Sequence, residues 1–133
     1  MSVGDSGAPT GASVERDTYP YGVQRTVAAN TPANQPETAT ISFDSPKRIL
    51  QLTIGFQGGA DHLVGVKIQK ATGERLAPRN DRVEYLTGDG DTYNYPLNAS
   101  VSSGEEIEIR FANLDTDDQF VNIVVTAEDR GGV

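Results

Sequence analysis

The sequence has no cysteine, no tryptophan and a single histidine, His62. Without cysteine the chain has no disulfide, no thiolate metal site and no thiol nucleophile. One imidazole is too few for the zinc and copper sites that use two or three histidines, and we expect His62 to be an exposed turn residue. The sequence also has no nucleophile elbow, phosphate-binding loop or dinucleotide fingerprint. These absences indicate that the protein is not an enzyme.

Positive charge is scarce as well. The chain carries 11 Lys and Arg against 19 Asp and Glu, a net charge of −8, and its lysines are Lys47, Lys67 and Lys70. Nucleic acids and anionic membranes both attract basic surfaces, so neither is an expected partner. An acidic, lysine-poor surface is typical of proteins that stay soluble in concentrated salt. We therefore expect a halophilic source, with an ordinary acidic protein as the alternative.

Prolines are concentrated toward the N-terminus, and glycines interrupt the same segment. We expect residues 1–37 to form an extended arm, residues 38–130 the folded domain and residues 131–133 a short tail. A segment of this composition cannot bury much of its own surface, so we expect it to become ordered against a neighbouring subunit, with its own domain as the alternative. The candidate contact residues in the arm are Tyr19, Tyr21, Val23 and Val27.

From residue 38 onward, apolar residues recur at every second position, which is the period of a β-strand. The expected strands are residues 38–43, 47–57, 62–70, 74–77, 82–87, 91–98, 105–112 and 119–128. In the second of these, Leu50, Leu52, Ile54 and Phe56 share the face expected to point inward. Pro96 has no amide hydrogen to donate, so we expect residues 91–98 to form an edge strand or to contain a bulge. About eight strands joined by frequent turns predict an all-β fold, an antiparallel two-sheet β-sandwich of jelly-roll type.

The last expected strand is apolar on both faces. Val121, Ile123 and Val125 lie on one face, and Phe120 and Val124 lie on the other. A strand of this kind is typical of one that is covered on both sides, between layers or between subunits. Phe120 and Val124 therefore join the candidate interface.

Two loops are rich in carboxylates, the type of oxygen ligand that calcium accepts. Neither matches the twelve-residue EF-hand loop, and such loops arise by chance in an acidic chain. We therefore expect no cofactor, with calcium or another cation as the alternative. The candidate ligands are Asp89, Asp91, Asp115, Asp117 and Asp118.

The order of segments supports one resemblance. The long amphipathic stretch KRILQLTIGFQ, the hairpin HLVGVKIQKATGERLAP and the closing pair SSGEEIEIRFANLDTDDQFVNIVVTAEDR follow one another between residues 38 and 130. This order resembles that of small jelly-roll decoration and turret proteins on the capsids of tailed viruses, and the acidic surface points to viruses of haloarchaea. No catalytic residue carries over from these proteins.

The resemblance implies a virion structural protein on the capsid exterior, not an enzyme. It would form a symmetric homo-oligomer, a trimer or a pentamer, on the major capsid protein, with the arm reaching a neighbouring subunit. The alternative is a carbohydrate- or cell-surface-binding β-sandwich module that uses Tyr93, Tyr95 or the acidic loops with calcium. The lack of tryptophan counts against glycan binding, although such a contact stays open.

Overall fold

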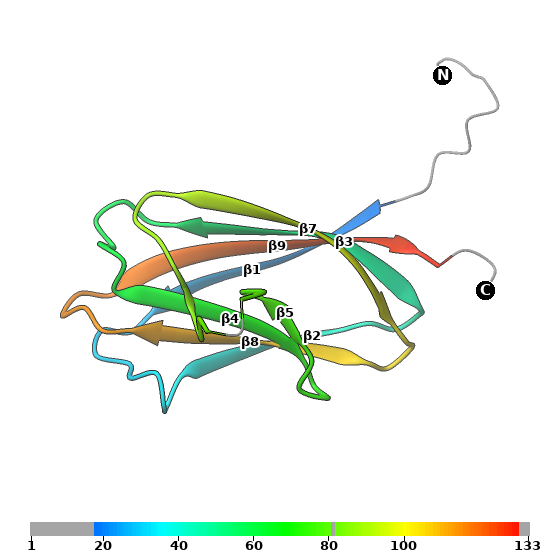
Figure 1. Ribbon diagram of the computed structural model, residues 1–133, viewed down its shortest axis with the longest axis horizontal. Coiled ribbons are helices and arrows are strands. Elements are labelled where there is room, and N and C mark those ends of the chain that lie inside the picture. Colours follow the sequence, from blue (N-terminus) through cyan, green and yellow to red (C-terminus); the bar gives the residue numbers. More distant parts are fainter. Residues whose placement is uncertain (1–17, 81, 131–133) are drawn as a thin grey trace, which may run out of the picture.

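The computed structural model describes residues 18–80 and 82–130, which form two facing β-sheets (Figure 1). The strands are β1 (Thr18–Val27), β2 (Glu37–Ser42), β3 (Lys47–Phe56), β4 (Val64–Lys70), β5 (Arg75–Ala77), β6 (Leu86–Thr87), β7 (Thr92–Val101), β8 (Glu106–Asn113) and β9 (Gln119–Asp129). Sheet A has the strand order β1-β9-β3-β7, and sheet B has the order β2-β8-β4-β5, with β6 paired to β4. Within the described residues there is no helix long and apolar enough to cross a membrane.

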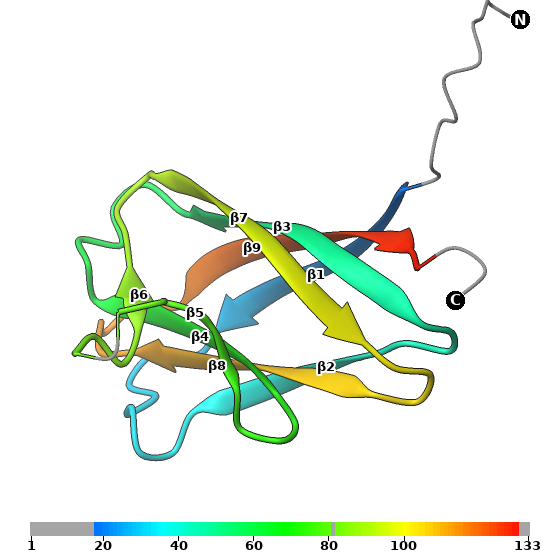
Figure 2. The same cartoon turned by 45° about the vertical axis from the view of Figure 1, so that its right-hand side comes forward.

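The strand pairs are nested. β1 pairs with β9, β2 with β8, β3 with β7 and β4 with β5, all antiparallel. The chain thus resembles one long hairpin that is rolled into two sheets, and the β3–β9 and β4–β8 ladders close the roll within each sheet. Figure 2 shows the two sheets packed face to face. This is the jelly-roll arrangement, and the predicted sandwich is confirmed.

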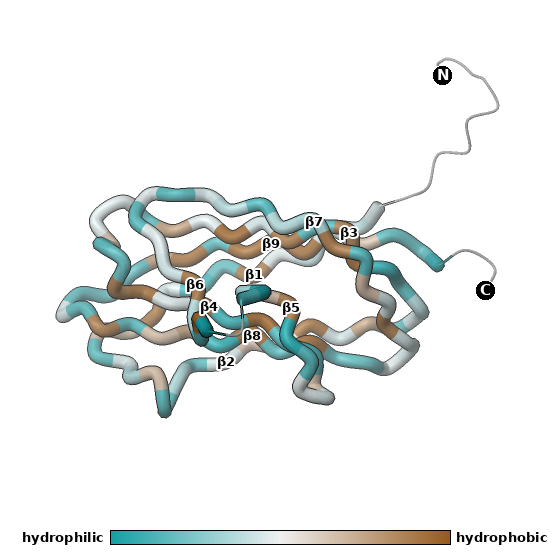
Figure 3. Tube along the Cα trace, in the orientation of Figure 1, coloured by the Kyte–Doolittle hydropathy of each residue, from teal (hydrophilic) through white to brown (hydrophobic). Residues whose placement is uncertain are grey.

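The core lies between the sheets and follows the predicted alternation. The largest fully buried side chains include Phe43, Phe111, Ile49, Leu52 and Ile54. Figure 3 shows the apolar positions along the inner strands and the hydrophilic ones in the connecting loops. Because most strands of the sandwich bury one face only, alternate residues face the core and the solvent.

The first strand corrects the predicted domain boundary. β1 pairs with β9 from Thr18 to Val27, the side chain of Val27 is fully buried, and the Tyr21 ring packs edge-on against Phe43 at 5.0 Å. Pro20 and Gly22 made a strand appear unfavourable in the sequence. Both lie at exposed positions of an edge strand, where proline is tolerated. The prediction that the arm extends to residue 37 is therefore wrong. Residues 1–17 and 131–133, the rest of the expected arm and the tail, lie outside the described residues.

The strand β3 differs from prediction in which residues face the core. Its register shifts between Ile49 and Gln51 against both β7 and β9. Such a bulge reverses the alternation, so Ile49 and Leu52 are both fully buried, whereas Leu50, which we expected to face the core, is partly exposed. Pro96 lies opposite Gln51 on β7, an edge strand of sheet A, as its sequence predicts.

The chain between β5 and β6 forms a loop over the outer face of sheet B, where we expected a strand at residues 82–87. Only Leu86 and Thr87 pair with β4. A Cβ added at Gly65 of β4 would lie 2.8 Å from the Cβ of Tyr85, so the glycine allows this loop to lie close to the sheet. The Lys67 ammonium pairs with Glu84 at 3.5 Å, and the Tyr85 hydroxyl donates to the carbonyl oxygen of Ala33 at 3.0 Å.

The position of β1 within the core can be tested by truncating one side chain. We expect Val27→Ala to lower the free energy of unfolding by about 2 kcal/mol, because it leaves a cavity in the core. Thr26→Ala, on the exposed side of the same strand, should change it by less than about 0.5 kcal/mol. Urea denaturation measures both. Equal effects of the two substitutions would place this segment outside the core.

Candidate functional site

The loop before β7 uses its carboxylates to fold itself. Asp89 Oδ1 accepts a hydrogen bond from the Gly59 amide at 2.8 Å, and Asp91 Oδ2 accepts one from the Asp89 amide at 3.2 Å. The single hydrogen of the Tyr93 hydroxyl is shared between the Thr87 carbonyl at 3.2 Å and Asp91 Oδ2 at 3.5 Å. These bonds hold the loop before β7 against the β3–β4 loop, which contains Gly59. The two aspartates therefore have a structural role.

The loop between β8 and β9 is built in a similar way. Asp115 accepts from the Thr116 amide and the Gln119 side chain at 2.7 and 2.9 Å, and Asp118 accepts from the Ala29 amide at 2.8 Å. In the part of the chain that the structure describes, no three Asp, Glu or His side chains gather in a group that could hold a metal ion. The five candidate ligands thus belong to two separately folded loops. The expectation of no cofactor, with calcium or another cation as the alternative, stays a prediction.

The arm residues proposed as contacts lie mainly on the inward side of β1. Val27 is fully buried, so it cannot contact a neighbouring subunit, and Tyr21 and Val23 pack against the core. His62, in contrast, is exposed in a tight turn with φ of 59°, as we expected. The tyrosines of the glycan alternative, Tyr93 and Tyr95, also pack against the core from β7.

Tyr19 belongs to a charged cluster where β1 begins and β9 ends. Its hydroxyl donates to Asp129 Oδ2 at 3.0 Å, and the Lys47 ammonium lies 4.0 Å from the centre of its ring. Lys47 also forms an ion pair with Asp129. The hydrogen bonds from Lys47 and from Tyr19 lower the pKa of the Asp129 carboxyl, and the bond to Asp129 raises the pKa of Lys47.

The outer face of sheet A carries almost no net charge. We call the outward side chains of β1, β9, β3 and β7 the neutral face, which consists mainly of Thr, Asn, Gln, Ser, Gly and Pro. Its only charged members are Arg48 and Glu128, which pair with each other at 3.5 Å. In a chain with a net charge of −8, a whole sheet face without excess charge is the clearest candidate for a contact surface.

One row of residues crosses the middle of the neutral face in register. It runs from Gly22 through Val124 and Thr53 to Asn94. Gln51 donates to Thr53 Oγ1 at 3.1 Å and to Asn94 Oδ1 at 3.0 Å, so these polar groups partly satisfy one another. Val124 therefore lies on this face.

Phe120 and Gly55 lie on the same face. Phe120 pairs with Thr26 and is 40% exposed, and Gly55 pairs with Asn122. The two contact candidates that the apolar β9 suggested, Phe120 and Val124, thus share one surface. The neutral residues around them escaped notice in the sequence, because they come from four strands that only the fold brings together.

The fold defines a small jelly-roll domain, and comparisons with known proteins agree with this class. No family model matches the sequence, and no curated protein matches it. Among solved structures, a chain in the capsid asymmetric unit of cyanophage Pam1 is similar, with 13% identity, a TM-score of 0.56 and coverage of 97% of each chain. A chain of infectious bursal disease virus, Gx strain, has 14% identity and a TM-score of 0.42, and the match covers 88% of this chain and 33% of that one. At such identities the likeness to the Pam1 chain concerns the fold.

The charged cluster predicts a pH dependence. Because the pKa of Asp129 is lower in the folded protein than its usual value of 3.8, its contribution to stability is present above that value and is lost as pH falls through the lowered pKa. We expect Asp129→Asn to destabilise the protein near neutral pH and to differ less and less from wild type as pH approaches 2. Thermal unfolding across this range measures the effect.

Tyr19→Phe provides a graded comparison, because it removes only the second of the two hydrogen bonds that lower this pKa. Its destabilisation at neutral pH should be smaller than that of Asp129→Asn and should fade over the same acid range. A constant difference between Asp129→Asn and wild type from pH 7 to pH 2 would contradict the assignment.

Proposed function

We propose that the protein is a structural component of a virion, a decoration or turret protein on the capsid exterior that acts by assembly and not by catalysis. The observation that carries this proposal is the likeness to a chain of the Pam1 capsid, because it extends over 97% of both chains. The two proteins thus share a whole jelly-roll domain of the same size. The acidic, lysine-poor composition further favours a virus of a saline habitat.

The same fold also carries lectins and cupins, so the fold alone does not decide the function. A cupin centre needs several histidines, and this chain has one. A glycan-binding face needs exposed aromatic side chains, yet the Tyr93 ring packs edge-on against Phe56 at 6.0 Å, and its hydroxyl donates to the Thr87 carbonyl at 3.2 Å. Tyr93, one of the two tyrosines of the carbohydrate alternative, is therefore engaged by its own domain.

The neutral face suits contact with a capsid shell made of other proteins. Burying charged groups without partners is costly, whereas Thr, Asn and Gly positions that already share hydrogen bonds lose less on desolvation. Four strands about 4.8 Å apart and roughly 33 Å long give a face of roughly 600 Å². This area approaches the ~800 Å² that each partner contributes to a standard interface. In this proposal the neutral face lies on the major capsid protein, and the charged outer face of sheet B stays hydrated.

The location can be tested on virus particles. Antibodies against the recombinant chain should label the outside of purified intact particles in immunoelectron microscopy, and protein mass spectrometry should find the chain in the same particles. Light scattering of the purified chain at low ionic strength should give the mass of a symmetric oligomer, a trimer or a pentamer. Particles that lack the chain, or label only after disruption, would sink the proposed location.

Two glycines on the neutral face allow a test that spares the fold. An added Cβ would meet no atom within 4 Å at Gly22, and at Gly55 it would make only ordinary contacts, 3.6 Å from Thr92 Oγ1 and 3.7 Å from the Asn122 carbonyl oxygen. We expect Gly22→Lys and Gly55→Lys to leave the melting temperature almost unchanged and to weaken binding to particles at least tenfold, since each buries an unpaired charge.

The matched control is Thr40→Lys, which adds the same charge at an exposed position of β2 on the outer face of sheet B. Cosedimentation with particles from which the chain has been removed measures all three variants against wild type. If Thr40→Lys binds as weakly as the two glycine variants, net charge and not the neutral face controls binding.

A further inference from the structure

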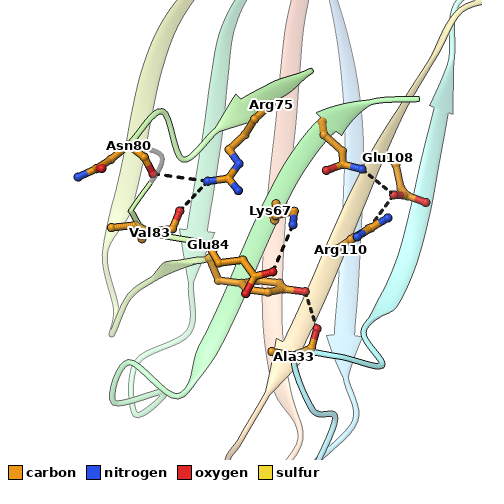
Figure 4. Close-up of polar contacts among 10 residues, drawn as sticks. Ala33, Lys67, Arg75, Asn80, Val83, Glu84, Glu108 and Arg110 are labelled. Carbon is orange, nitrogen blue, oxygen red and sulfur yellow. Dashed lines mark hydrogen bonds and ion pairs between the residues drawn. The ribbon is translucent and has the colours of Figure 1, made fainter. Parts of the chain in front are cut away.

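Positive charge without a described carboxylate partner gathers at Arg75, Arg79 and Arg82. Among the described residues it recurs only at Arg130, whose guanidinium donates to the Val101 carbonyl at 3.4 Å. Arg79 and Arg82 form no side-chain hydrogen bond or ion pair, whereas each of the other described lysines and arginines forms at least one. The guanidinium of Arg75 donates to the main-chain carbonyls of Val83 at 2.7 Å and Asn80 at 3.5 Å, and none of the described carboxylates pairs with it (Figure 4). Three arginines of an acidic chain thus present their charge to solvent together.

We call Arg75, Arg79, Arg82 and the neighbouring Val83 the arginine corner. Val83 is 41% exposed, so the corner also has an apolar element. Arg75 and Arg79 line a hollow of about 230 Å³ between the β4–β5 hairpin and β7, together with Lys70 and Glu74. Because Lys70 already pairs with Glu74 at 3.6 Å, the arginines leave this hollow positive.

A second patch of the surface carries negative charge instead. The side chains of Asp61 and Asp117 form no hydrogen bond or ion pair, and beside them Leu63 is 37% and Leu114 is 61% exposed. The Leu114 amide donates to the Leu63 carbonyl at 2.9 Å, which joins the β3–β4 and β8–β9 loops. We call these four residues the acidic tip.

The two patches contain most of the exposed large apolar side chains, and most of the carboxylates without a partner, among the described residues. Of the four large apolar side chains that are exposed, Leu63 and Leu114 are in the tip and Val83 is in the corner, while Phe120 belongs to the neutral face. Asp44, the other described carboxylate without a partner, lies in the β2–β3 loop away from both patches. Figure 1 shows the loops of the tip at one end of the sandwich, where Leu63 precedes the first residue of β4, whereas Arg75 of the corner pairs with Gln69 near the last residue of that strand.

We propose that the arginine corner of one copy docks on the acidic tip of a second copy. The contact would pair arginines with aspartates and Val83 with the two leucines, so that charged and apolar groups both find partners. A second copy is the favoured occupant because one chain carries both halves of the contact. Elsewhere a net charge of −8 makes two copies repel.

Such a contact joins two different patches and is therefore head-to-tail. Head-to-tail contacts close into rings when the rotation between copies allows it, which is the geometry of a cyclic trimer or pentamer. The inference rests on the homo-oligomer part of the proposed function and names the surfaces that would form it.

Charge reversal tests the contact directly. We expect Arg79→Glu with Arg82→Glu to raise the dissociation constant of the oligomer at least tenfold, because acidic groups would then face the acidic tip. On the other side we expect the same from Asp117→Lys with Asp61→Asn. Asparagine is chosen at position 61 because that residue has φ of 53°, which asparagine tolerates better than lysine. Combining all four substitutions should restore association, since the carboxylates introduced in the corner would meet the ammonium introduced in the tip.

Sedimentation velocity at about 50 mM salt measures these dissociation constants, and added salt should weaken the wild-type contact. Circular dichroism and melting temperature verify that each variant is folded. The matched control is Asp44→Lys, which reverses an unpaired carboxylate outside both patches and should leave association unchanged.

The outcomes separate this inference from the rest of the proposed function. If the wild-type chain is a monomer, the inference fails together with the homo-oligomer, whereas the virion location is judged by immunoelectron microscopy alone. If the wild type is an oligomer that neither patch variant weakens, only the inference fails. If the corner variant weakens it but the tip variant does not, the corner binds another surface and the proposed pairing is wrong.

Discussion

The jelly roll depends on the pairing of β9 with two neighbours at once. β9 lies between β1 and β3 and pairs with each along most of its length, which brings the start and the end of the described chain into one sheet. Its inward side chains, Val121, Ile123, Val125 and Ala127, are all fully buried. Because side chains alternate along a strand, this burial also fixes Phe120 and Val124 on the outside. The position of the neutral face therefore follows from the same register that builds the core.

The sequence predicted the fold best where burial is one-sided and pairing is regular. In β4, β8 and β9 the apolar alternation gave both the strand and its inward face. β1 was missed because Pro20 and Gly22 interrupt its pattern, although both occupy exposed positions of an edge strand. The predicted inward face of β3 was right from Leu52 onward and wrong at Leu50, because the bulge arises from matching two neighbouring strands, which local periodicity does not report.

The candidate surfaces were less predictable than the fold. The sequence displays acidic loops, but only the structure tells which carboxylates bond to backbone amides, as Asp89 and Asp118 do, and which have no partner, such as Asp117. Only the structure shows that the arginines of the corner have no described carboxylate partner, because an excess of acidic residues in the sequence gives no reason to expect unpaired guanidinium groups. The one available signal was the crowding of basic residues between positions 67 and 82 in an otherwise acidic chain.

The edges of sheet A limit how copies of this chain can meet. An exposed edge strand offers unpaired amides and carbonyls to any other strand, and proline removes an amide hydrogen from that row. Sheet A has a proline in each of its two edge strands, Pro20 in β1 and Pro96 in β7. Extension of this sheet by a neighbouring copy is thereby disfavoured. Contacts through sheet A must then be made by side chains on its face and loops, where charge and shape select the partner, and the neutral face and the acidic tip are surfaces of that kind.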